Sequence, residues 1–250
     1  MTAWFTPGPP RIIAHRGLAT EAPENTLLAF VSALALGVTH LETDVHATSD
    51  GVAVLSHDPD LARLTGRATA IASTSLAALQ RIDLGADQQV PTLRETLRAF
   101  PDARFNIDIK ADAALQPTID AILRERAVER VLVTSFDDAR RKAAVAALPG
   151  VATSPSSRGV VLAALASRAP TARLRRLGFR DIDAIQVPER YRGVPIVTGR
   201  LVEAAHESGV EVHVWTIDDA DDMRRLFALG VDGVITDRAD IGLEVLTRLV

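Results

Sequence analysis

The 250-residue chain has no cysteine, few aromatic residues and no long apolar run. Without cysteine it forms no disulfide and offers neither a thiolate metal ligand nor a cysteine nucleophile. Its most apolar later stretch, residues 27–38, contains Ser32 and Gly37 and falls short of the ~20 residues that span a bilayer. The net charge is −4 without a dense basic segment, so electrostatics give no argument for nucleic-acid binding.

Residues 1–10 have no basic start and no apolar stretch of signal-peptide length. The absence of cysteine fits a reducing compartment. We therefore expect a soluble, cytoplasmic protein without a membrane span. The apolar fraction of 47% and the charged fraction of 24% are ordinary for such a protein, and they do not indicate an oligomeric state.

Strand-like and helix-like segments alternate along the chain, and two of the helices are predicted at residues 23–36 and 160–167. Such alternation predicts right-handed strand–helix–strand units and a parallel sheet. Eight such units in 250 residues predict an α/β fold, a TIM-type (β/α)8 barrel in a single domain over residues 1–250. An open doubly wound sheet is the alternative, but no glycine-rich phosphate turn follows the first strand. The barrel strands are expected to begin near residues 11, 40, 104, 130, 151, 183, 211 and 233.

A hairpin and a short insertion interrupt the alternation after the second strand. Residues 52–57 follow residues 40–47 across a turn that contains Asp50-Gly51. A connection this short makes an antiparallel pair, so this strand stands outside the parallel count. Residues 58–91 then predict loops with one short helix, which form a small insertion.

Acidic side chains gather on one face of two predicted strands. Side chains alternate across a strand, so Glu42 and Asp44 share a face, and Asp108 and Lys110 share a face of a later strand. Buried acids are costly unless they are paired or bound to a cation. Three inward carboxylates predict an all-oxygen site for Mg²⁺, Ca²⁺ or Mn²⁺. An ion-pair network with Lys110 and Arg16 is the alternative.

Two histidines end strands near these acids. His15 precedes Arg16-Gly17, and His57 ends the hairpin strand. A lone histidine in such a place is more often structural, but two of them beside a cation site favour a general acid and base. Arg16 and Lys110 would hold phosphate oxygens, the arginine through a bidentate fork. Gly17 either lets the backbone approach a ligand closely or forms a simple turn.

Other residues have structural interpretations. The spacing that puts His213 and Trp215 on one face of a strand favours packing inside the barrel. His40 is interpreted as a residue at the end of the core. Helical arginine pairs such as Arg140-Arg141 predict solvated helix faces.

Several short motifs follow one another in order over nearly the whole chain, with the weakest stretch between about 150 and 180. Together they resemble the glycerophosphodiester phosphodiesterase family, although His-Arg-Gly alone would not be specific. The motifs are His15-Arg16-Gly17, residues 23–26, Glu42-Thr43-Asp44, His57-Asp58, residues 79–85, 90–93 and 106–110, Thr134-Ser135-Phe136, Trp215-Thr216 and residues 230–237.

The resemblance implies a barrel with its site at the C-terminal mouth and hydrolysis of a small glycerophosphodiester to sn-glycerol 3-phosphate and an alcohol. It implies His15 and His57 as the acid/base pair and a divalent cation, Mg²⁺ or Ca²⁺ with Mn²⁺ as a further choice. The remaining implied site residues are Glu42, Asp44 and Asp108 as cation ligands, Arg16 and Lys110 on the phosphate, and Phe136 and Trp215 along the substrate.

The chain departs from the family at two positions, and two other functions compete. The family usually has Glu at the position of Asp108, so a ligand one methylene shorter predicts a deeper or weaker cation site, or a water as ligand. The family often has Asn at the position of Asp218.

A lysophospholipase D would need an apolar groove at the mouth of the barrel, and the lack of a Trp/Phe-rich loop argues against this activity. A non-catalytic phosphate-binding barrel would need no histidine pair.

Overall fold

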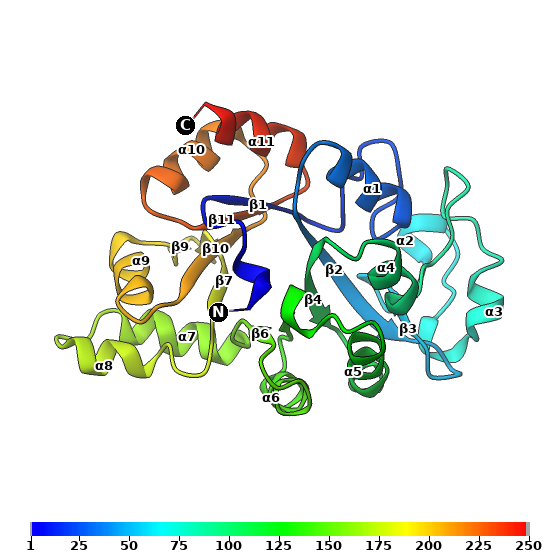
Figure 1. Ribbon diagram of the computed structural model, residues 1–250, viewed down its shortest axis with the longest axis horizontal. Coiled ribbons are helices and arrows are strands. Elements are labelled where there is room, and N and C mark those ends of the chain that lie inside the picture. Colours follow the sequence, from blue (N-terminus) through cyan, green and yellow to red (C-terminus); the bar gives the residue numbers. More distant parts are fainter. Residues whose placement is uncertain (1, 249–250) are drawn as a thin grey trace.

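The computed structural model describes residues 2–248. Eight parallel strands form a nearly closed barrel, and helices surround it (Figure 1). Around the barrel the strands follow the order β6-β5-β4-β2-β1-β11-β10-β7. The bounds are β1 Arg11–Ala14, β2 His40–Ala47, β4 Arg104–Ile109, β5 Val131–Thr134, β6 Ala152–Thr153, β7 Ala184–Pro188, β10 Glu211–Trp215 and β11 Gly233–Thr236.

The helices connect successive strands and pack on the outside of the barrel. They are α1 Leu27–Ala35, α4 Leu93–Ala99, α5 Leu115–Arg124, α6 Asp138–Ala147, α7 Ser157–Ala166, α8 Ala172–Leu177, α9 Gly199–His206, α10 Ala220–Ala228 and α11 Ala239–Thr247. Four 3-10 turns add to them, namely η1 Ala3–Phe5, η2 Ile71–Ser73, η3 Asp112–Ala114 and η4 Val128–Arg130.

The predicted barrel is confirmed, and each of its eight strands begins within one residue of the predicted start. The predicted hairpin is confirmed as well, because β3 (Ala53–Leu55) pairs antiparallel with β2. The insertion that follows contains α2 (Ala62–Thr65) and α3 (Leu76–Leu79) and buries a small apolar cluster of its own. It lies on the outer side of β2 and β3, at the right of Figure 1.

Two helix predictions were wrong in their bounds. The helix expected from residue 23 begins at Leu27, because Thr26 caps it by accepting a hydrogen bond from the Ala29 N–H. Asn25 adopts a left-handed backbone (φ 57°), so it stands outside the helix. The helix expected from residue 160 begins three residues earlier, after the N-cap Ser156.

Two further elements between β6 and β10 were not predicted. They are the six-residue α8 and a small hairpin of β8 (Arg190–Tyr191) and β9 (Val194–Pro195). Both are short, and neither carries a clear apolar period. The hairpin is an extension of the connection after β7, so it stands at the C-terminal end of the barrel strands.

The barrel closes between β6 and β7 with few backbone hydrogen bonds. The Asp183 N–H donates to the Thr153 carbonyl (2.9 Å), and its carboxylate accepts from the Thr153 N–H (2.9 Å). The Ser154 hydroxyl accepts from the backbone N–H of Gln186 (3.2 Å). Side chains therefore complete the seam where the short β6 leaves the ladder incomplete.

Apolar side chains form two main layers. The larger one fills the space between strands and helices, and it includes Leu41 and Val45 of β2. A smaller cluster lies inside the barrel and contains Ile13, Leu132 and Ile235 together with Trp4 of η1. The N-terminal segment crosses one end of the barrel, as the blue chain in Figure 1 shows. The barrel interior above this cluster is left for polar residues.

Within residues 2–248 no helix combines the length and the apolar character needed to cross a membrane.

Candidate active site

A cavity of about 560 Å³ opens at the C-terminal ends of the barrel strands. This is the end where barrel enzymes carry their active sites. All the predicted site residues border it, so the structure brings together side chains from six strands or their following loops. These residues are His15, Arg16, Glu42, Asp44, His57, Asp108, Lys110, Phe136 and Trp215.

The acidic part of the cavity is built by strand register. β2 and β4 run parallel with Asp44 opposite Asp108, so two buried carboxylates stand side by side. The Lys110 ammonium lies 2.7 Å from Asp44 Oδ1 and 2.7 Å from Asp108 Oδ2, and Arg16 Nε lies 3.1 Å from Asp44. The ion pairs considered as an alternative therefore do exist at this end of the barrel.

These charges shift the carboxyl groups in opposite directions. Burial alone would raise the pKa of Asp44, but Lys110 and Arg16 outweigh it and hold that pKa below its ordinary value. Burial dominates for Asp108 and raises its pKa despite Lys110. For Glu42 burial, and next the charge of Asp44, raise the pKa. Burial is therefore the main cause of both raised pKa values, and only at Asp44 does the nearby positive charge outweigh it.

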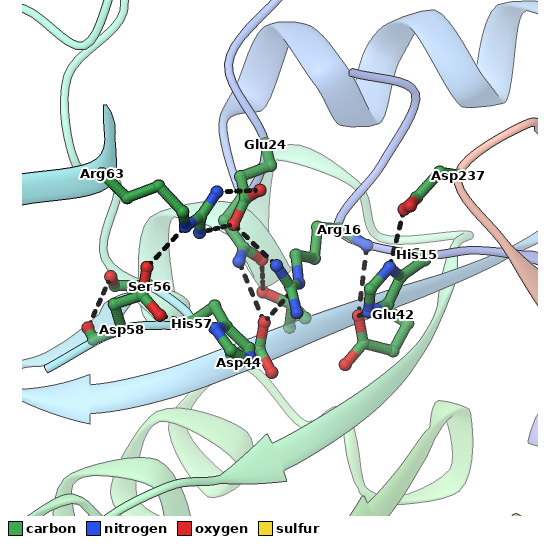
Figure 2. A network of polar contacts seen from close by, with 12 residues as sticks. His15, Arg16, Glu24, Glu42, Asp44, Ser56, His57, Asp58, Arg63 and Asp237 are labelled. Carbon is green, nitrogen blue, oxygen red and sulfur yellow. Dashed lines mark hydrogen bonds and ion pairs between the residues drawn. The ribbon is translucent and has the colours of Figure 1, made fainter. Parts of the chain in front are cut away.

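His15 is held by a carboxylate from the last strand. Its Nδ1 lies 2.7 Å from Asp237 Oδ1, while its Nε2 lies 3.9 Å from Glu42 Oε2 (Figure 2). Burial lowers the pKa of His15, but the hydrogen bond to Asp237 and the charge of Glu42 outweigh burial, so the pKa is raised. Asp218 in turn accepts hydrogen bonds from the Asp237 N–H (2.9 Å) and from Thr236 (2.8 Å).

His57 has a similar arrangement on the other side of the cavity. Its Nδ1 lies 2.8 Å from Asp58 Oδ1, and Arg63 of the insertion binds the same carboxylate through Nε (2.6 Å). Arg63 also donates to Glu24, which accepts a further hydrogen bond from Arg16 (Figure 2). A continuous polar chain therefore links the partner of His57 to the predicted phosphate arginine.

The loop after β1 is fixed by backbone packing. A Cβ on Gly17 (φ +87°) would come within 2.7 Å of the Ala29 carbonyl carbon. The glycine is therefore required for the approach of this loop to α1, which favours the turn over the ligand-contact interpretation. The same loop directs the Arg16 N–H onto Glu42 (3.1 Å).

The donor set of the cavity suits a hard divalent cation. Its carboxylates offer oxygen only, and the buried Asp108 Oδ1 and Asn106 Oδ1 have no hydrogen-bond partner in the described part of the chain. Among residues 2–248 no three His, Asp or Glu side chains are already drawn together around one point as ligands. The Lys110 ammonium lies between two of the predicted ligands, Asp44 and Asp108.

Several residues that build the site received no role from the sequence. Asp237 and Asp58 occur within quoted motifs, but only the fold shows that they orient histidines. Asn25 donates to Asp44 (3.1 Å) and accepts from Thr43 (2.7 Å).

The solvated-face prediction for Arg140 was wrong. Its guanidinium donates to the Ile109 and Lys110 carbonyls (3.0 and 3.1 Å), which fixes the end of β4. Arg141 is buried as well. An arginine pair on a helix looks the same in sequence whether it faces water or a strand end.

The far end of the cavity is apolar. Val160, Val161, Ala164 and Leu165 follow one another at helical spacing along α7, and all of them border the cavity. The β8–β9 hairpin contributes Tyr191, Val194 and Pro195 to the lining, and Ile196 follows directly after it. Phe136 and Trp215 stand edge to face, with ring centroids 6.3 Å apart, and border the same cavity. The mouth therefore has an apolar wall without a Trp/Phe-rich loop.

The mouth of this TIM barrel combines two carboxylate-held imidazoles, inward acids and two cationic side chains, a set of groups that suits hydrolysis of a phosphoric ester. Residues 15–241 match the model of the Glycerophosphoryl diester phosphodiesterase family. The chain belongs to this family and is a phosphoric diester hydrolase. This excludes the non-catalytic phosphate-binding barrel.

Three relatives place the chain within the family. It is 43% identical over 236 residues to a probable glycerophosphodiester phosphodiesterase 2 of Mycobacterium tuberculosis, covering 94% of this chain and 89% of the relative. It is 37% identical over 115 residues to lysophospholipase D GDPD1 of Rattus norvegicus, covering 41% of this chain and 37% of that one. An Oleispira antarctica phosphodiesterase solved with the product sn-glycerol-3-phosphate superimposes with a TM-score of 0.79 at 26% identity, covering 96% and 97% of the two chains.

Proposed function

We propose that this protein hydrolyses glycerophosphodiesters to sn-glycerol 3-phosphate and an alcohol, with His15 and His57 as its acid/base pair. The observation that carries the proposal is that both imidazoles border one cavity and each has a carboxylate at Nδ1. A carboxylate at Nδ1 fixes the proton on that nitrogen and leaves Nε2 for proton transfer. The product seen in the Oleispira antarctica phosphodiesterase agrees with this reaction.

The raised pKa of His15 divides the roles within the pair. A raised pKa favours the protonated imidazole, so His15 would donate the proton to the leaving alkoxide through Nε2. His57 would then accept the proton of the nucleophile through its own Nε2. The nucleophile is either water or the substrate's own 2-hydroxyl, which would give a cyclic phosphate before hydrolysis, and the two routes remain alternatives.

Arg16 and Lys110 would hold the phosphate. Both cations border the cavity and both also touch Asp44. Negative charge that develops on the phosphoryl oxygens during attack is stabilised by such fixed cations. The Lys110 ammonium also stands 5.5 Å from the centre of the Phe136 ring, which restricts where it can point.

Glu42, Asp44 and Asp108 would hold a divalent cation, with Mg²⁺, Ca²⁺ and Mn²⁺ as the candidates. Such an ion, when bound, supplies Lewis-acid polarisation of a phosphate oxygen. The raised pKa values of Glu42 and Asp108 support the proposal, because a cation would stabilise both carboxylates in their charged form. Lys110 would have to turn from Asp108 toward the phosphate as the ion enters.

Lysophospholipids are the second candidate substrates. The apolar wall of α7 and the hairpin is the groove that this activity needs, and aliphatic side chains provide it. The partial similarity to the lysophospholipase D of Rattus norvegicus agrees with this choice. The chemistry at the phosphate would be unchanged.

The test is turnover of purified protein on glycerophosphocholine, glycerophosphoethanolamine and lysophosphatidylcholine, with each candidate cation and with chelator. We expect turnover of at least one diester that chelator abolishes and a cation restores. His206→Ala, a partly exposed histidine on α9, is the matched control and should retain activity. Absence of turnover on all three substrates with every cation would refute the proposed function, and unchanged turnover in chelator would refute the cation.

A further inference from the structure

The apolar part of the cavity lining comes largely from an arginine-rich stretch of the chain. Between residues 155 and 200 the chain has nine arginines, three acidic residues and no lysine, although its net charge is −4. This stretch includes α7 and the β8–β9 hairpin, both of which contribute side chains to the lining of the cavity. We call α7 and the β8–β9 hairpin together the rim surface.

Apolar side chains of the rim surface remain in contact with solvent. Val161 and Leu165 lie one helical turn apart on α7, and Tyr191 and Val194 stand on the hairpin. Each is more than half exposed and each also borders the cavity. Contiguous exposed apolar groups of this kind mark interaction surfaces in soluble proteins.

Cationic side chains accompany these apolar groups. Arg158 and Arg192 are exposed, and within residues 2–248 neither has an acidic side chain within ion-pair distance. The Arg192 guanidinium stands 5.5 Å from the centre of the Tyr191 ring, and Arg168 borders the cavity at the other end of α7. Guanidinium groups without carboxylate partners are suited to phosphate oxygens, which they bind through a planar fork.

We propose that the rim surface binds the surface of an anionic lipid bilayer. Aliphatic and aromatic groups beside unpaired cations are the combination that holds a protein at a lipid headgroup layer. Because the rim surface continues into the cavity, a substrate could pass from the bilayer to the histidines. The acyl chain of a monoacyl substrate would lie along Val161 and Leu165 while its phosphate reaches the histidines.

The inference deepens the proposed function, because it assumes that the cavity is the active site. A single-stranded nucleic acid is a weaker match, since stacking surfaces for bases are aromatic and the rim offers only Tyr191 beside aliphatic groups. A bilayer uses both the aliphatic groups and the arginines.

The test is cosedimentation with vesicles of phosphatidylcholine alone and of phosphatidylcholine with phosphatidylglycerol, without substrate. We expect binding to the anionic vesicles that weakens with salt, and little binding to the zwitterionic ones. The variant R158E/R192E should bind at least tenfold more weakly. The matched control R98E/R124E makes the same charge change on α4 and α5 and should bind as the unmodified protein does.

A second variant separates a bilayer from a general polyanion. Tyr191→Ser with Val194→Ser removes apolar contact and no charge, so it should weaken vesicle binding severalfold and leave binding to heparin unchanged. Equal vesicle binding by R158E/R192E and R98E/R124E would overturn the inference. So would vesicle binding that Tyr191→Ser with Val194→Ser leaves intact, because the surface would then recognise charge alone.

Failure of this inference is distinguishable from failure of the proposed function. Vesicle binding is measured without turnover, and glycerophosphocholine is hydrolysed in free solution without vesicles. A protein that hydrolyses glycerophosphocholine but binds no vesicle loses only the rim inference. A protein that binds vesicles but hydrolyses no diester loses the proposed function and keeps its lipid surface.

Discussion

The two ends of the barrel interior hold similar residue types in different states. At the N-terminal end Arg11, His40, Glu211 and His213 are gathered under Trp4. At the C-terminal mouth two histidines meet arginine, lysine and acids around a cavity. The first group does not border that cavity, and its charges are paired with one another. Residue type therefore does not define a site, whereas an open cavity at the C-terminal ends of the strands does.

At the N-terminal end, the charged and polar groups form short ion pairs and hydrogen bonds with one another. Arg11 Nη2 lies 2.6 Å from Glu211 Oε1, and His213 Nε2 lies 3.0 Å from Glu211 Oε2. His40 donates from Nε2 to the Trp4 carbonyl (2.7 Å) and accepts at Nδ1 from Thr39 (2.9 Å). Within the described chain, buried polar atoms without a hydrogen-bond partner occur at both ends of the barrel interior, Arg11 Nε and Trp4 Nε1 at this one and Asp108 Oδ1 and Asn106 Oδ1 at the other. Of these four residues, only Asp108 and Asn106 border the cavity. The comparison predicts that changes at one end act on stability and changes at the other on turnover.

The largest effect is expected at the mouth. His57→Ala should lower kcat about 10²- to 10⁴-fold, because a general acid or base contributes that much. The side chain is more than a third exposed, so the free energy of unfolding should change little. Steady-state kinetics on glycerophosphocholine measures the effect, with His206→Ala as control. A loss below tenfold would remove His57 from the acid/base pair.

The corresponding change at the N-terminal end should act on stability. Arg11→Met leaves Glu211 without its cation, and breaking a buried pair costs about 3 kcal/mol or more. Urea unfolding measures the loss, and kcat of the folded protein should remain near that of the unmodified chain. Arg98→Met, at an exposed position on α4, should change stability by less than about 0.5 kcal/mol. A strong fall in kcat with intact stability would break the comparison between the ends.

A smaller effect is expected at the carboxylate that orients His15. Asp237→Asn should lower kcat about 10- to 100-fold, because the imidazole loses its fixed tautomer. The hydrogen bond to Asp237 helps to raise the pKa of His15, so its loss should move the His15 limb of the pH–rate profile to lower pH. Asp221→Asn, at an exposed site on α10, should leave both readouts unchanged. If the His15 limb of the pH–rate profile did not move, Asp237 would only support the loop after β11.

The smallest effect, when it is counted per pH unit, is the pH dependence of stability. Burial, and next the charge of Arg11, lower the pKa of His40 to about 3. In the unfolded chain histidine binds a proton near pH 6.5, so below that pH the unfolded state holds more protons. Stability should therefore fall between about pH 6.5 and 3, by at most about 1.4 kcal/mol per pH unit from this group. Urea unfolding at several pH values should show a shallower slope in His40→Gln.

Much of the fold could be predicted from the sequence, because strand alternation and the Asp50-Gly51 turn are local signals. The site residues could also be predicted to meet, since all of them except His57 stand on a parallel barrel strand or in the loop that follows one, and His57 follows the hairpin strand beside β2. Which of these side chains contact one another could not be predicted from the sequence. Asp44 faces Asp108 through register across two strands, and Asp237 reaches His15 from the other end of the chain.

The apolar wall was missed for a different reason. The α7 helix was predicted too short, and the hairpin that faces it was not predicted. Val161 and Leu165 look like core residues of an ordinary outer helix. Only the position of α7 beside the cavity gives them another role. The same limit applies to Arg140, whose contacts with β4 carbonyls have no sequence signal.

The most direct test changes one histidine at each end of the barrel interior and measures turnover and unfolding for both variants. We predict that His15→Ala loses at least about 10²-fold in kcat with nearly unchanged stability. We predict that His40→Ala loses about 1–3 kcal/mol of stability, because the Trp4 carbonyl loses its short hydrogen bond, while the folded fraction retains turnover. Unchanged turnover in His15→Ala, or a comparable loss of kcat in folded His40→Ala, would contradict this division between a structural and a catalytic end.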